Sequence, residues 1–307
     1  MAYLHSDREQ FRDAIDLAYE QTGVMVQAIE KDYYVTMLLR LLAQKMPYIV
    51  FKGGTSLSKC HKVIRRFSED IDISIDTLLS QGQKKKIKQA IVDSAQELGM
   101  MIENLDETRS RRDYNRYVIA YDSVIPMASD ALKAAVLLET SYTAVSFPTV
   151  LLPVHSYIGD MMEQEAPDAI EEYNLNPFEM KVQGIDRTLA DKVFAVCDYY
   201  LQGKVAKHSR HLYDIYKLLP LVPQDENFKE LVKEVRAVRE QSVICPSALP
   251  EANVPELLEK IIKEKAYKQD YDSLTTQLLE ENMPYDTVIA ALKQIADGAM
   301  FDNTYGG

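Results

Sequence analysis

The feature that most constrains the fold is a change of hydrophobic period on either side of a double glycine. Residues 48–51 (YIVF) form a short apolar run of the kind that builds a buried strand, and they lead into Gly53 and Gly54. A helical pattern follows, and residues 70–76 (DIDISID) then alternate polar and apolar side chains. A period of two indicates a half-buried strand, so this part of the chain mixes helix and strand.

The remainder of the chain adds to this mixture in its first half and becomes helical in its second. Ser6 followed by Glu9 has the spacing of a capping box and predicts a helix through about residue 21. The other expected elements are helices at 26–45 and 83–99 and strands near 116–125 and 133–142. After about residue 185 nearly every segment has helical periodicity. We expect an α+β chain with a mixed sheet and N-terminal helices in residues 1–185 and a helical lobe in residues 186–307.

Composition is that of a globular protein able to bury a large core. The chain has 307 residues, of which 47% are hydrophobic and 27% charged. Its N-terminus has no basic head before an apolar run, and no apolar segment approaches the roughly 18 residues of a membrane span. We therefore expect a cytoplasmic protein without a membrane partner. Cys60, Cys197 and Cys245 form no CxxC pair, so we interpret them as ordinary thiols.

Charge is distributed unevenly. The net charge of −12 argues against wholesale wrapping of nucleic acid, yet residues 52–116 hold thirteen bases and ten acids, which gives +3 there and −15 elsewhere. The basic stretches 83–89 and 109–116 are by default solvated faces. If they flank the alternating strand, they would steer a polyanionic acceptor towards it. Tyr114 and Tyr117 interleave with the second stretch and are candidates for stacking on unpaired bases.

The alternating strand presents paired carboxylates. Asp70 and Asp72 fall on one face, about 7 Å apart along the strand. That separation suits divalent ions bridged between them, and magnesium prefers carboxylate and phosphate oxygens. Glu139, at the end of the apolar run AAVLLE, is placed to add a third carboxylate from a neighbouring strand. The alternatives are an edge strand with its polar face in water and a solvated Glu139 at a strand exit.

The double glycine predicts an anion cradle. Glycines at a strand end let backbone N–H groups approach a phosphate, and the following helix start adds its positive dipole end. Thr55 and Ser56 offer hydroxyl donors, and one of them is the expected helix N-cap. The alternative is a plain strand-to-helix turn. Neither the GxxxxGK[ST] spacing nor GxGxxG occurs here.

The helical half offers weaker signals. Lys192 lies on an otherwise apolar helix and would either reach a phosphate as a point charge or extend to the surface. Arg210 and Asp214 have the i,i+4 spacing of a surface ion pair. His208 and His211 have the spacing of metal ligands, but no further ligand is spaced to complete a zinc site.

These residues resemble the AbiEii-type toxins of abortive-infection and toxin–antitoxin pairs, a branch of the polymerase-beta-like nucleotidyltransferases. The glycine pair followed by D-x-D is shared across that superfamily, whereas the EKDY, ADK and RxxYD motifs are more specific to this branch. The matching segments span most of the chain in the expected order: IEKDYYV at 29–35, FKGGTSLSK at 51–59, RFSEDIDISI at 66–75, LADKVFA at 189–195 and RHLYDIYKL at 210–218.

The resemblance implies a bilobal protein that binds a nucleotide between its lobes. It implies that the triphosphate is contacted by Gly53, Gly54, Thr55 and Ser56, and that further nucleotide contacts come from Lys192 and Arg210. It implies that Mg²⁺ or Mn²⁺ is bound by Asp70, Asp72 and, less securely, Glu139. Asp214 would be another active-site acid. The substrate would be a nucleoside triphosphate, the acceptor an RNA such as a tRNA 3′ end, and the partner a cognate antitoxin.

The expected activity is therefore magnesium-dependent transfer of a nucleoside monophosphate. Glu139 or Asp214 would help to deprotonate the acceptor, and Lys192 would offset developing charge. A glycosyltransferase is one alternative, because D-x-D also binds a metal and a sugar-nucleotide diphosphate, although the glycine pair disfavours it. A non-catalytic nucleotide-binding protein is the other.

Overall fold

The computed structural model describes residues 2–68, 70–126 and 134–302. Its contacts divide the chain into two units. The first comprises Met1–His61 and Ser68–Gln183, and the second comprises Lys62–Phe67 and Gly184–Gly307. The short segment 62–67 thus leaves the first unit between two of its elements and belongs to the second, which the sequence does not indicate.

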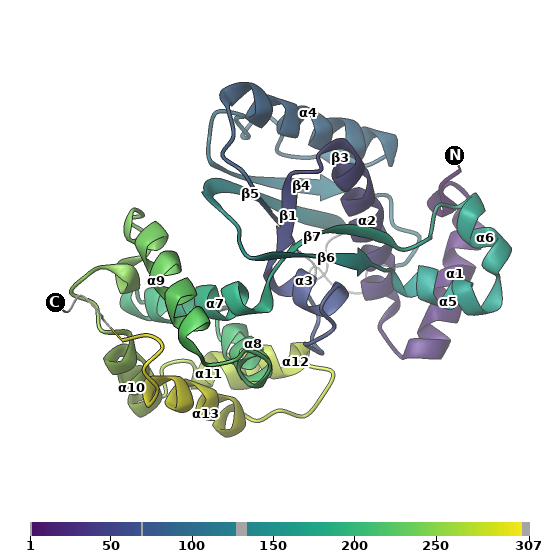
Figure 1. Cartoon of the computed structure of the whole chain (residues 1–307). Helices are drawn as coiled ribbons and strands as arrows, with labels where there is room; N and C mark the ends of the chain where they lie inside the picture. The colour runs from purple at the N-terminus through teal and green to yellow at the C-terminus, as the bar shows by residue number, and fades with distance from the viewer. Residues whose placement is uncertain (1, 69, 127–133, 303–307) are drawn as a thin grey trace. The chain divides into compact units, whose positions relative to one another are not determined.

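The first unit is built on a mixed seven-stranded sheet in the order β3-β4-β5-β2-β1-β7-β6 (Figure 1). β2 pairs parallel with β5 and antiparallel with β1, and β1 pairs parallel with β7. The strands are β1 (Ile49–Lys52), β2 (Ile71–Ile75), β3 (Met101–Ile102), β4 (Tyr114–Ala120), β5 (Ala135–Val145), β6 (Thr149–Val154) and β7 (Phe178–Gln183). The expected mixed sheet within an α+β fold is confirmed.

The alternating strand is the centre of this sheet. β2 has three strands on each side, so the edge-strand alternative is wrong. Ile71, Ile73 and Ile75 are buried, as the period of two predicts. Ser74 on the opposite face is also buried, whereas Asp72 is partly exposed. One face of β2 is therefore core, and the other opens at its N-terminal end, where the aspartates lie.

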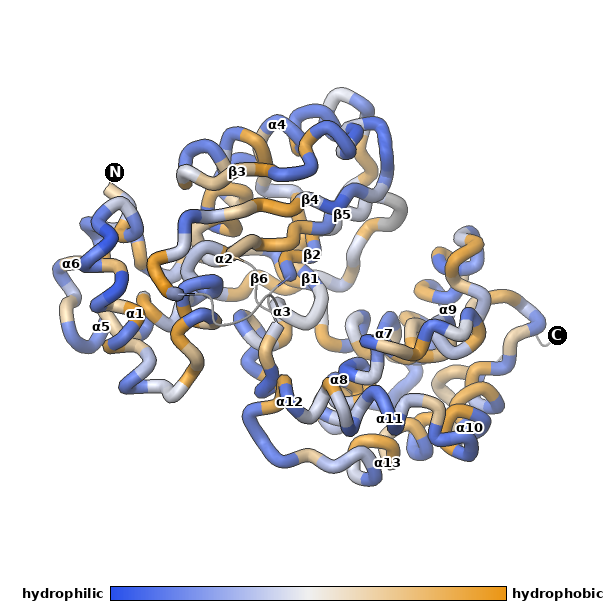
Figure 2. The backbone as a smooth tube through the Cα atoms, turned by 180° about the vertical axis from the view of Figure 1, so that it is seen from behind, coloured by the Kyte–Doolittle hydropathy of each residue, from blue (hydrophilic) through white to orange (hydrophobic). Residues whose placement is uncertain are grey.

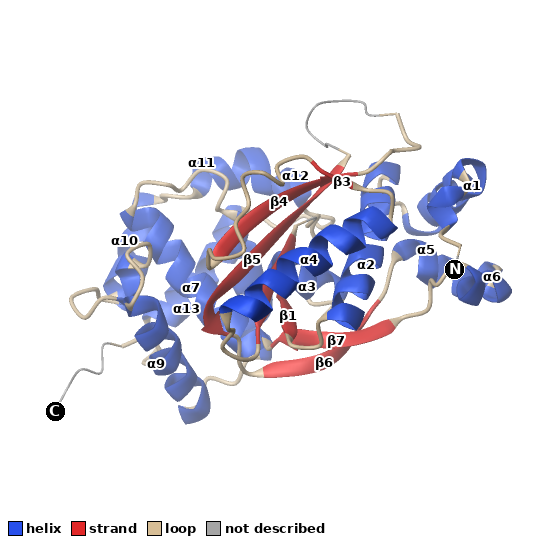
Figure 3. Cartoon of the chain, turned by 90° about the horizontal axis from the view of Figure 1, so that it is seen from above, coloured by secondary structure: helices blue, strands red, loops and turns tan. Residues whose placement is uncertain are grey.

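The first unit also contains helices, of which α2 (Val26–Lys45) and α4 (Gln81–Glu97) cover the apolar face of the sheet (Figure 3). The others are α1 (Arg8–Thr22), α3 (Gly53–Lys59), α5 (Tyr157–Glu165) and α6 (Pro167–Glu172), preceded by the 3₁₀ turn η1 (Leu4–Ser6). α2 and α4 lie side by side across the strands (Figure 3). α2 is buried almost all round, while α4 alternates hydrophobic and hydrophilic residues, as expected of an outer helix (Figure 2).

Two expected helix starts are wrong. α1 is capped by Asp7, whose carboxylate accepts from the N–H groups of Glu9 and Gln10, and Ser6 belongs to the preceding 3₁₀ turn. α3 begins at Gly53, two residues before Thr55 and three before Ser56, and no side chain caps it. The glycines themselves form the first turn of the helix, whereas the sequence predicted a turn that precedes the helix.

The second unit contains the rest of the helices. They are α7 (Ile185–Leu201), α8 (Arg210–Leu218), α9 (Glu226–Glu240), α10 (Val254–Glu264), α11 (Lys268–Asp270), α12 (Thr276–Leu278) and α13 (Tyr285–Ala296), with 3₁₀ turns η2 (Leu219–Leu221) and η3 (Pro246–Ala248) and a π-helical segment η4 (Tyr271–Thr275). α7 packs against α8 and α9, and α13 packs against α8 and α10.

Some elements escape the sequence reading. β6, β7, α5 and α6 occupy residues 149–183, where no element was expected, and the two-residue strand β3 was also missed. The strand expected at 133–142 is β5, described from Ala135, while Lys133 lies outside the described residues. Among the described helices, none combines the length and hydrophobicity needed to cross a bilayer.

Candidate active site

A row of four charged residues crosses the centre of the sheet. Arg116 of β4 is the register partner of Glu139 on β5, Glu139 is the partner of Asp72 on β2, and Asp72 is the partner of Lys52 on β1. Register partners point to the same face, and neighbouring strands are about 4.8 Å apart. Two carboxylates therefore stand side by side between two cations. Like charges directly opposite each other destabilise a sheet, so this pair is the kind of local conflict that marks a functional site.

Gly53 is the point where the turn meets this row. Its φ is +80°, a conformation that L side chains rarely adopt, and a Cβ built on it would lie 1.9 Å from Asp72 Oδ2. The position thus requires glycine for two independent reasons, backbone conformation and space. The glycine turn and the second aspartate of D-x-D are in direct contact, as a shared site requires.

The hydroxyls after the glycines hold the turn in shape. Ser56 is fully buried, and its hydroxyl donates to the Gly53 carbonyl over 2.9 Å. The Thr55 hydroxyl lies 2.9 Å from that of Ser68. The N–H groups of the first turn of α3, which starts at Gly53 and Gly54, have no side-chain cap. The hydroxyls of Thr55 and Ser56 are thus engaged within the protein, and anion binding by the backbone of this turn stays a prediction.

Asp70 precedes β2 and carries an unsatisfied oxygen. Its Oδ1 is buried and has no hydrogen-bond partner among the described residues. An orphaned carboxylate oxygen is costly in a folded protein, because it has lost its water without gaining a donor. A cation is one group that would satisfy it. Glu69, within the matching motif, lies outside the described residues.

Glu139 interacts with two neighbours, Arg116 and Tyr114. Arg116 Nε lies 3.7 Å from Glu139 Oε1, and about a third of the glutamate side chain is exposed. Burial raises the pKa of Tyr114, and the charge of Glu139, a hydrogen bond to it and the charge of Asp72 raise it further. Tyr114 therefore stays protonated and donates to Glu139. The structure places Glu139 in the row as a partly exposed acid, while its role in metal binding stays a prediction.

The donor set fits a magnesium-type ion better than a closed metal centre. Throughout the described ranges, no three His, Cys, Asp or Glu side chains already gather where they would hold a metal. Mg²⁺ is usually bound through one or two carboxylates together with waters and substrate phosphates, so it needs no such cage. The orphaned oxygen of Asp70 and the carboxylate of Asp72 supply the oxygen ligands that this mode requires.

The EKDY motif braces the turn, a role that spacing alone did not reveal. Lys59, the last residue of α3, donates to Asp32 Oδ1 over 2.5 Å and to the His155 carbonyl over 2.6 Å. The other oxygen of Asp32 accepts from the backbone N–H of Tyr157. Lys59 is nearly buried, so this ion pair ties α3 to α2. In the sequence, this contact was indicated only by Lys59 at the end of the helix that follows the glycines and by the acid Asp32 of the motif.

The second unit holds a buried ion triad. Asp214 Oδ1 accepts from Arg66 Nε over 2.7 Å, and Oδ2 accepts from Arg66 over 2.8 Å and from Lys192 Nζ over 2.6 Å. The Asp214 side chain is fully buried. The expected surface pair of Arg210 with Asp214 is therefore wrong. Lys192 also does not extend to the surface, because it is buried against Asp214.

The triad fixes the charge state of its members. Burial by itself raises the pKa of Asp214, but Arg66 and Lys192 outweigh it, and the pKa lies well below its usual range. Burial, together with the charge of Arg66, lowers the pKa of Lys192 against the attraction of Asp214. A carboxylate with a strongly lowered pKa is a poor proton acceptor. The predicted roles of Lys192, Arg210 and Asp214 in nucleotide binding and catalysis stay predictions.

The remaining candidates from the sequence are Tyr117, the two histidines and the three cysteines. Tyr117 is buried, so it is unavailable for stacking. His208 and His211 have parallel rings stacked with Tyr199, and the described chain brings no third ligand to them. The three cysteines are buried thiols.

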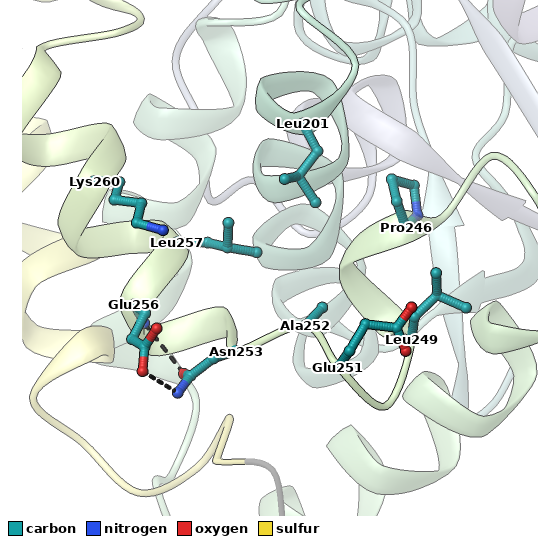
Figure 4. A pocket seen from close by; sticks show the side chains of 9 residues that line it. All are labelled: Leu201, Pro246, Leu249, Glu251, Ala252, Asn253, Glu256, Leu257 and Lys260. Atoms are coloured by element: carbon teal, nitrogen blue, oxygen red, sulfur yellow. Dashed lines mark hydrogen bonds between the residues drawn. The ribbon is translucent and has the colours of Figure 1, made fainter.

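A pocket of about 350 Å³ lies in the second unit, between the end of α7, η3 and the start of α10 (Figure 4). Asn253 and Glu256 bond each other there, as a helix cap does, with distances of 2.8 and 3.2 Å. Both groups thus serve the helix cap, and leucines such as Leu249 and Leu257 make up much of the wall. None of the site residues expected from the sequence lines this pocket.

A glycine turn packed on adjacent carboxylates in a mixed sheet is an arrangement suited to phosphoryl transfer, and the family comparison identifies the class as nucleotidyltransferases. The family model described as nucleotidyl transferase AbiEii toxin of type IV toxin–antitoxin systems matches residues 36–294. This chain belongs to that AbiEii nucleotidyltransferase toxin family. The solved structure of MenT4, nucleotidyltransferase toxin Rv2826c from Mycobacterium tuberculosis H37Rv, is similar with a TM-score of 0.51 and 15% identity, over 92% of this chain and 88% of that one.

That structural likeness, at such low identity, shows the fold alone. No curated protein matches the sequence. Family membership supports the nucleotidyltransferase expectation over the glycosyltransferase and over the non-catalytic binding protein.

Proposed function

We propose that this toxin uses divalent cations on Asp70, Asp72 and Glu139 to transfer a nucleoside monophosphate from a nucleoside triphosphate to an RNA hydroxyl. A tRNA 3′ end is the acceptor to test first, and a cognate antitoxin is the partner that a type IV system implies. The single observation that carries this proposal is the contact of Gly53 with Asp72, because it joins a turn suited to phosphate with a carboxylate suited to a cation.

In the reaction, the acceptor oxygen bonds to the α-phosphorus, the bond from that phosphorus to the bridging oxygen breaks, and pyrophosphate leaves. Cations bound to the carboxylates would neutralise polyphosphate charge and stabilise the entering and leaving oxygens. Asp70, Asp72 and one carboxylate oxygen of Glu139 would hold them. The first-turn N–H groups of Gly53, Gly54 and Thr55 would orient the triphosphate, and Ser56 would keep the turn in shape through its bond to Gly53.

Glu139 is the better proton acceptor of the two acids that the sequence suggested. Its side chain is partly exposed beside Asp72, whereas Asp214 is fully buried and bonded to two cations. We propose that the second carboxylate oxygen of Glu139, the one that holds no cation, takes the proton of the acceptor hydroxyl, with Tyr114 and Arg116 fixing the orientation of the carboxylate. Lys192 and Arg210 remain candidate nucleotide contacts.

The test is to incubate the purified chain with each labelled nucleoside triphosphate, Mg²⁺ and total RNA, and to resolve the products on a gel. We expect label in a discrete RNA band, release of pyrophosphate, and loss of both in Asp70→Ala and Asp72→Ala variants that retain wild-type thermal stability. Undiminished labelling by the folded variants would refute the assignment. Labelling of a sugar or of protein would redirect it to another acceptor.

A further inference from the structure

The two basic stretches of the sequence meet on one surface of the first unit. Lys84 of α4 forms an ion pair with Asp113, and Lys88 Nζ donates to the Thr108 carbonyl over 2.9 Å. These contacts join the start of α4 to the loop between β3 and β4. The rest of α4 and the short strand β3 separate the two stretches in the sequence, but these contacts bring them together into a single surface.

Much of the positive charge on this surface is not neutralised. Arg109 donates to the Thr108 carbonyl, and Arg112 donates to the Glu107 carbonyl over 3.1 Å. A carbonyl orients a cation but leaves its net charge in place. Burial and the nearby charge of Arg109 lower the pKa of Lys88, as expected where cations crowd together.

The charge count supports the same conclusion. Residues 84–88 and 103–116 together hold eight bases and four acids, a net +4 on a chain of net charge −12. The acids are Glu103, Asp106, Glu107 and Asp113, and the last is paired with Lys84. Lys85, Lys86, Arg111 and Arg112 are exposed.

The loop part of this surface leads directly into the strand that carries Arg116 of the carboxylate row. Tyr114 begins β4 immediately after the basic loop, and it is 52% exposed. Arg116, on the same face of the strand, lies beside Glu139. Proteins that bind single-stranded nucleic acid combine exposed aromatic rings, on which bases stack, with a positively charged groove that follows the phosphates. The exposed ring of Tyr114 and the cations next to it offer this combination beside the carboxylate row.

We propose that Lys85, Lys86, Arg111, Arg112 and Tyr114 bind an unpaired segment of the RNA acceptor and lead its reacting end to Glu139. This inference rests on the proposed function for the acceptor's chemistry. The cations contact backbone phosphates, and the Tyr114 ring stacks on one base. Because an overall acidic chain repels RNA elsewhere, binding is local and short.

The experiment measures binding of a fluorescent single-stranded RNA oligonucleotide by anisotropy, with the full chain and without nucleotide. The variants are R111E/R112E, K85E/K86E and Tyr114→Ala. Of the two charge-reversal variants, K85E/K86E is the one more certain to fold, because acidic residues near the start of α4 interact favourably with its helix dipole. The control K260E/K263E makes the same change of charge at two exposed positions of α10. Tyr114→Phe keeps the ring and removes the hydroxyl.

We expect each patch variant to weaken RNA binding at least about tenfold, and to lower the salt slope of log K by about 1 to 2, since a single-strand phosphate contact contributes about 0.7. Tyr114→Ala weakens binding by about tenfold and Tyr114→Phe by less than about threefold. Equal losses in the α10 control, or wild-type affinity in both patch variants, would overturn the proposal, as would tighter binding of duplex than of single-stranded RNA.

The outcome for the surface is separable from that for the reaction. Asp72→Asn is expected to bind the RNA at least as well as wild type, because it removes a negative charge. If the patch variants lose RNA binding while wild-type protein labels no RNA, the surface stands and the proposed reaction fails. If wild-type protein labels RNA and the patch variants still bind it normally, the reaction stands and the surface is refuted.

Discussion

Two groups of carboxylates, one in each unit, differ in how their charge is compensated. Asp214 is fully buried, and three donors from two cations bond its oxygens. Asp72 and Glu139 are adjacent like charges on a partly open face, and Oδ1 of Asp70, two residues before Asp72, has no hydrogen-bond partner among the described residues. Removing a compensated buried acid strands its buried cations and destabilises the fold, while an under-compensated group of acids is suited to cations that arrive with a substrate. The comparison predicts opposite responses to the same change from Asp to Asn.

The largest expected effect is on stability in the triad. Asp214→Asn leaves Arg66 and Lys192 buried without their anion, which should lower the free energy of unfolding by about 3–5 kcal/mol. The measurement is urea unfolding followed by circular dichroism. Asp297→Asn, which breaks an exposed i,i+4 pair in the same unit, is the control and should cost less than about 0.5 kcal/mol.

The same variant also tests the sequence expectation for Asp214. A chain that is as stable as wild type would break the comparison. If instead Asp214→Asn is destabilised but inactive at a temperature where it is fully folded, then Asp214 acts in the reaction as well.

The next effect is on activity in the row. Asp72→Asn should reduce nucleotide incorporation by about 10²- to 10³-fold or more, as for other removed transition-state contacts. Its stability should be unchanged or slightly increased, since repulsion from Glu139 is relieved by roughly 0.2–1 kcal/mol. Initial rates and melting temperatures of the same preparations check both. A large loss of stability with normal activity would mean that Asp72 is structural.

A smaller effect is expected where the turn meets the row. Gly53→Ala strains a positive φ and drives Asp72 from its place, so incorporation should fall by about tenfold or more. Gly99→Ala is the matched control, because Gly99 has a φ of +64° with nothing within 4 Å of a built Cβ. Both variants should lose about 1 kcal/mol of stability from strain, but only Gly53→Ala should lose activity. Equal activities would show that the contact with Asp72 is dispensable.

The smallest effect is a pH dependence in the second unit. Burial, followed by the charge of Lys192, lowers the pKa of His211 well below its usual value near 6.5. The unfolded chain therefore takes up a proton below about pH 6.5 that the folded chain refuses, and stability falls as the pH drops, by up to about 1.4 kcal/mol per unit. Thermal melts between pH 7.5 and 5.5 should show a weaker slope in His211→Gln than in wild type. Identical slopes would contradict this.

The sequence predicted what local patterns encode. The strand, glycine pair and alternating strand were visible because each has its own period or backbone requirement, and Asp70, Asp72, Gly53 and Gly54 follow from them. Glu139 beside Asp72 depends on the pairing of β2 with β5, two strands far apart in the chain. Periodicity identifies a strand but does not choose its neighbour, so this adjacency needed the structure.

The triad was missed for a related reason. Arg66 meets Asp214 across 148 residues of sequence, and the nearer Arg210 offered a local partner at helical spacing. Asp214 lies on the buried side of α8, and a buried carboxylate needs cations that are packed against it, wherever they occur in the sequence. It therefore pairs with Arg66 and Lys192. The helix cap of α3 was misassigned because glycines at a helix start resemble a loop until their dihedral angles are known.

The most direct test of the account is divalent-ion binding measured by the electron paramagnetic resonance of Mn²⁺. The ion should be titrated into wild type, Asp72→Asn and the exposed control Asp297→Asn, each with and without a non-hydrolysable nucleoside triphosphate. We predict that nucleotide strengthens Mn²⁺ binding beyond the ion's affinity for nucleotide alone, and that Asp72→Asn abolishes this gain while the control keeps it. Equal Mn²⁺ binding by wild type and Asp72→Asn in the presence of nucleotide would contradict it.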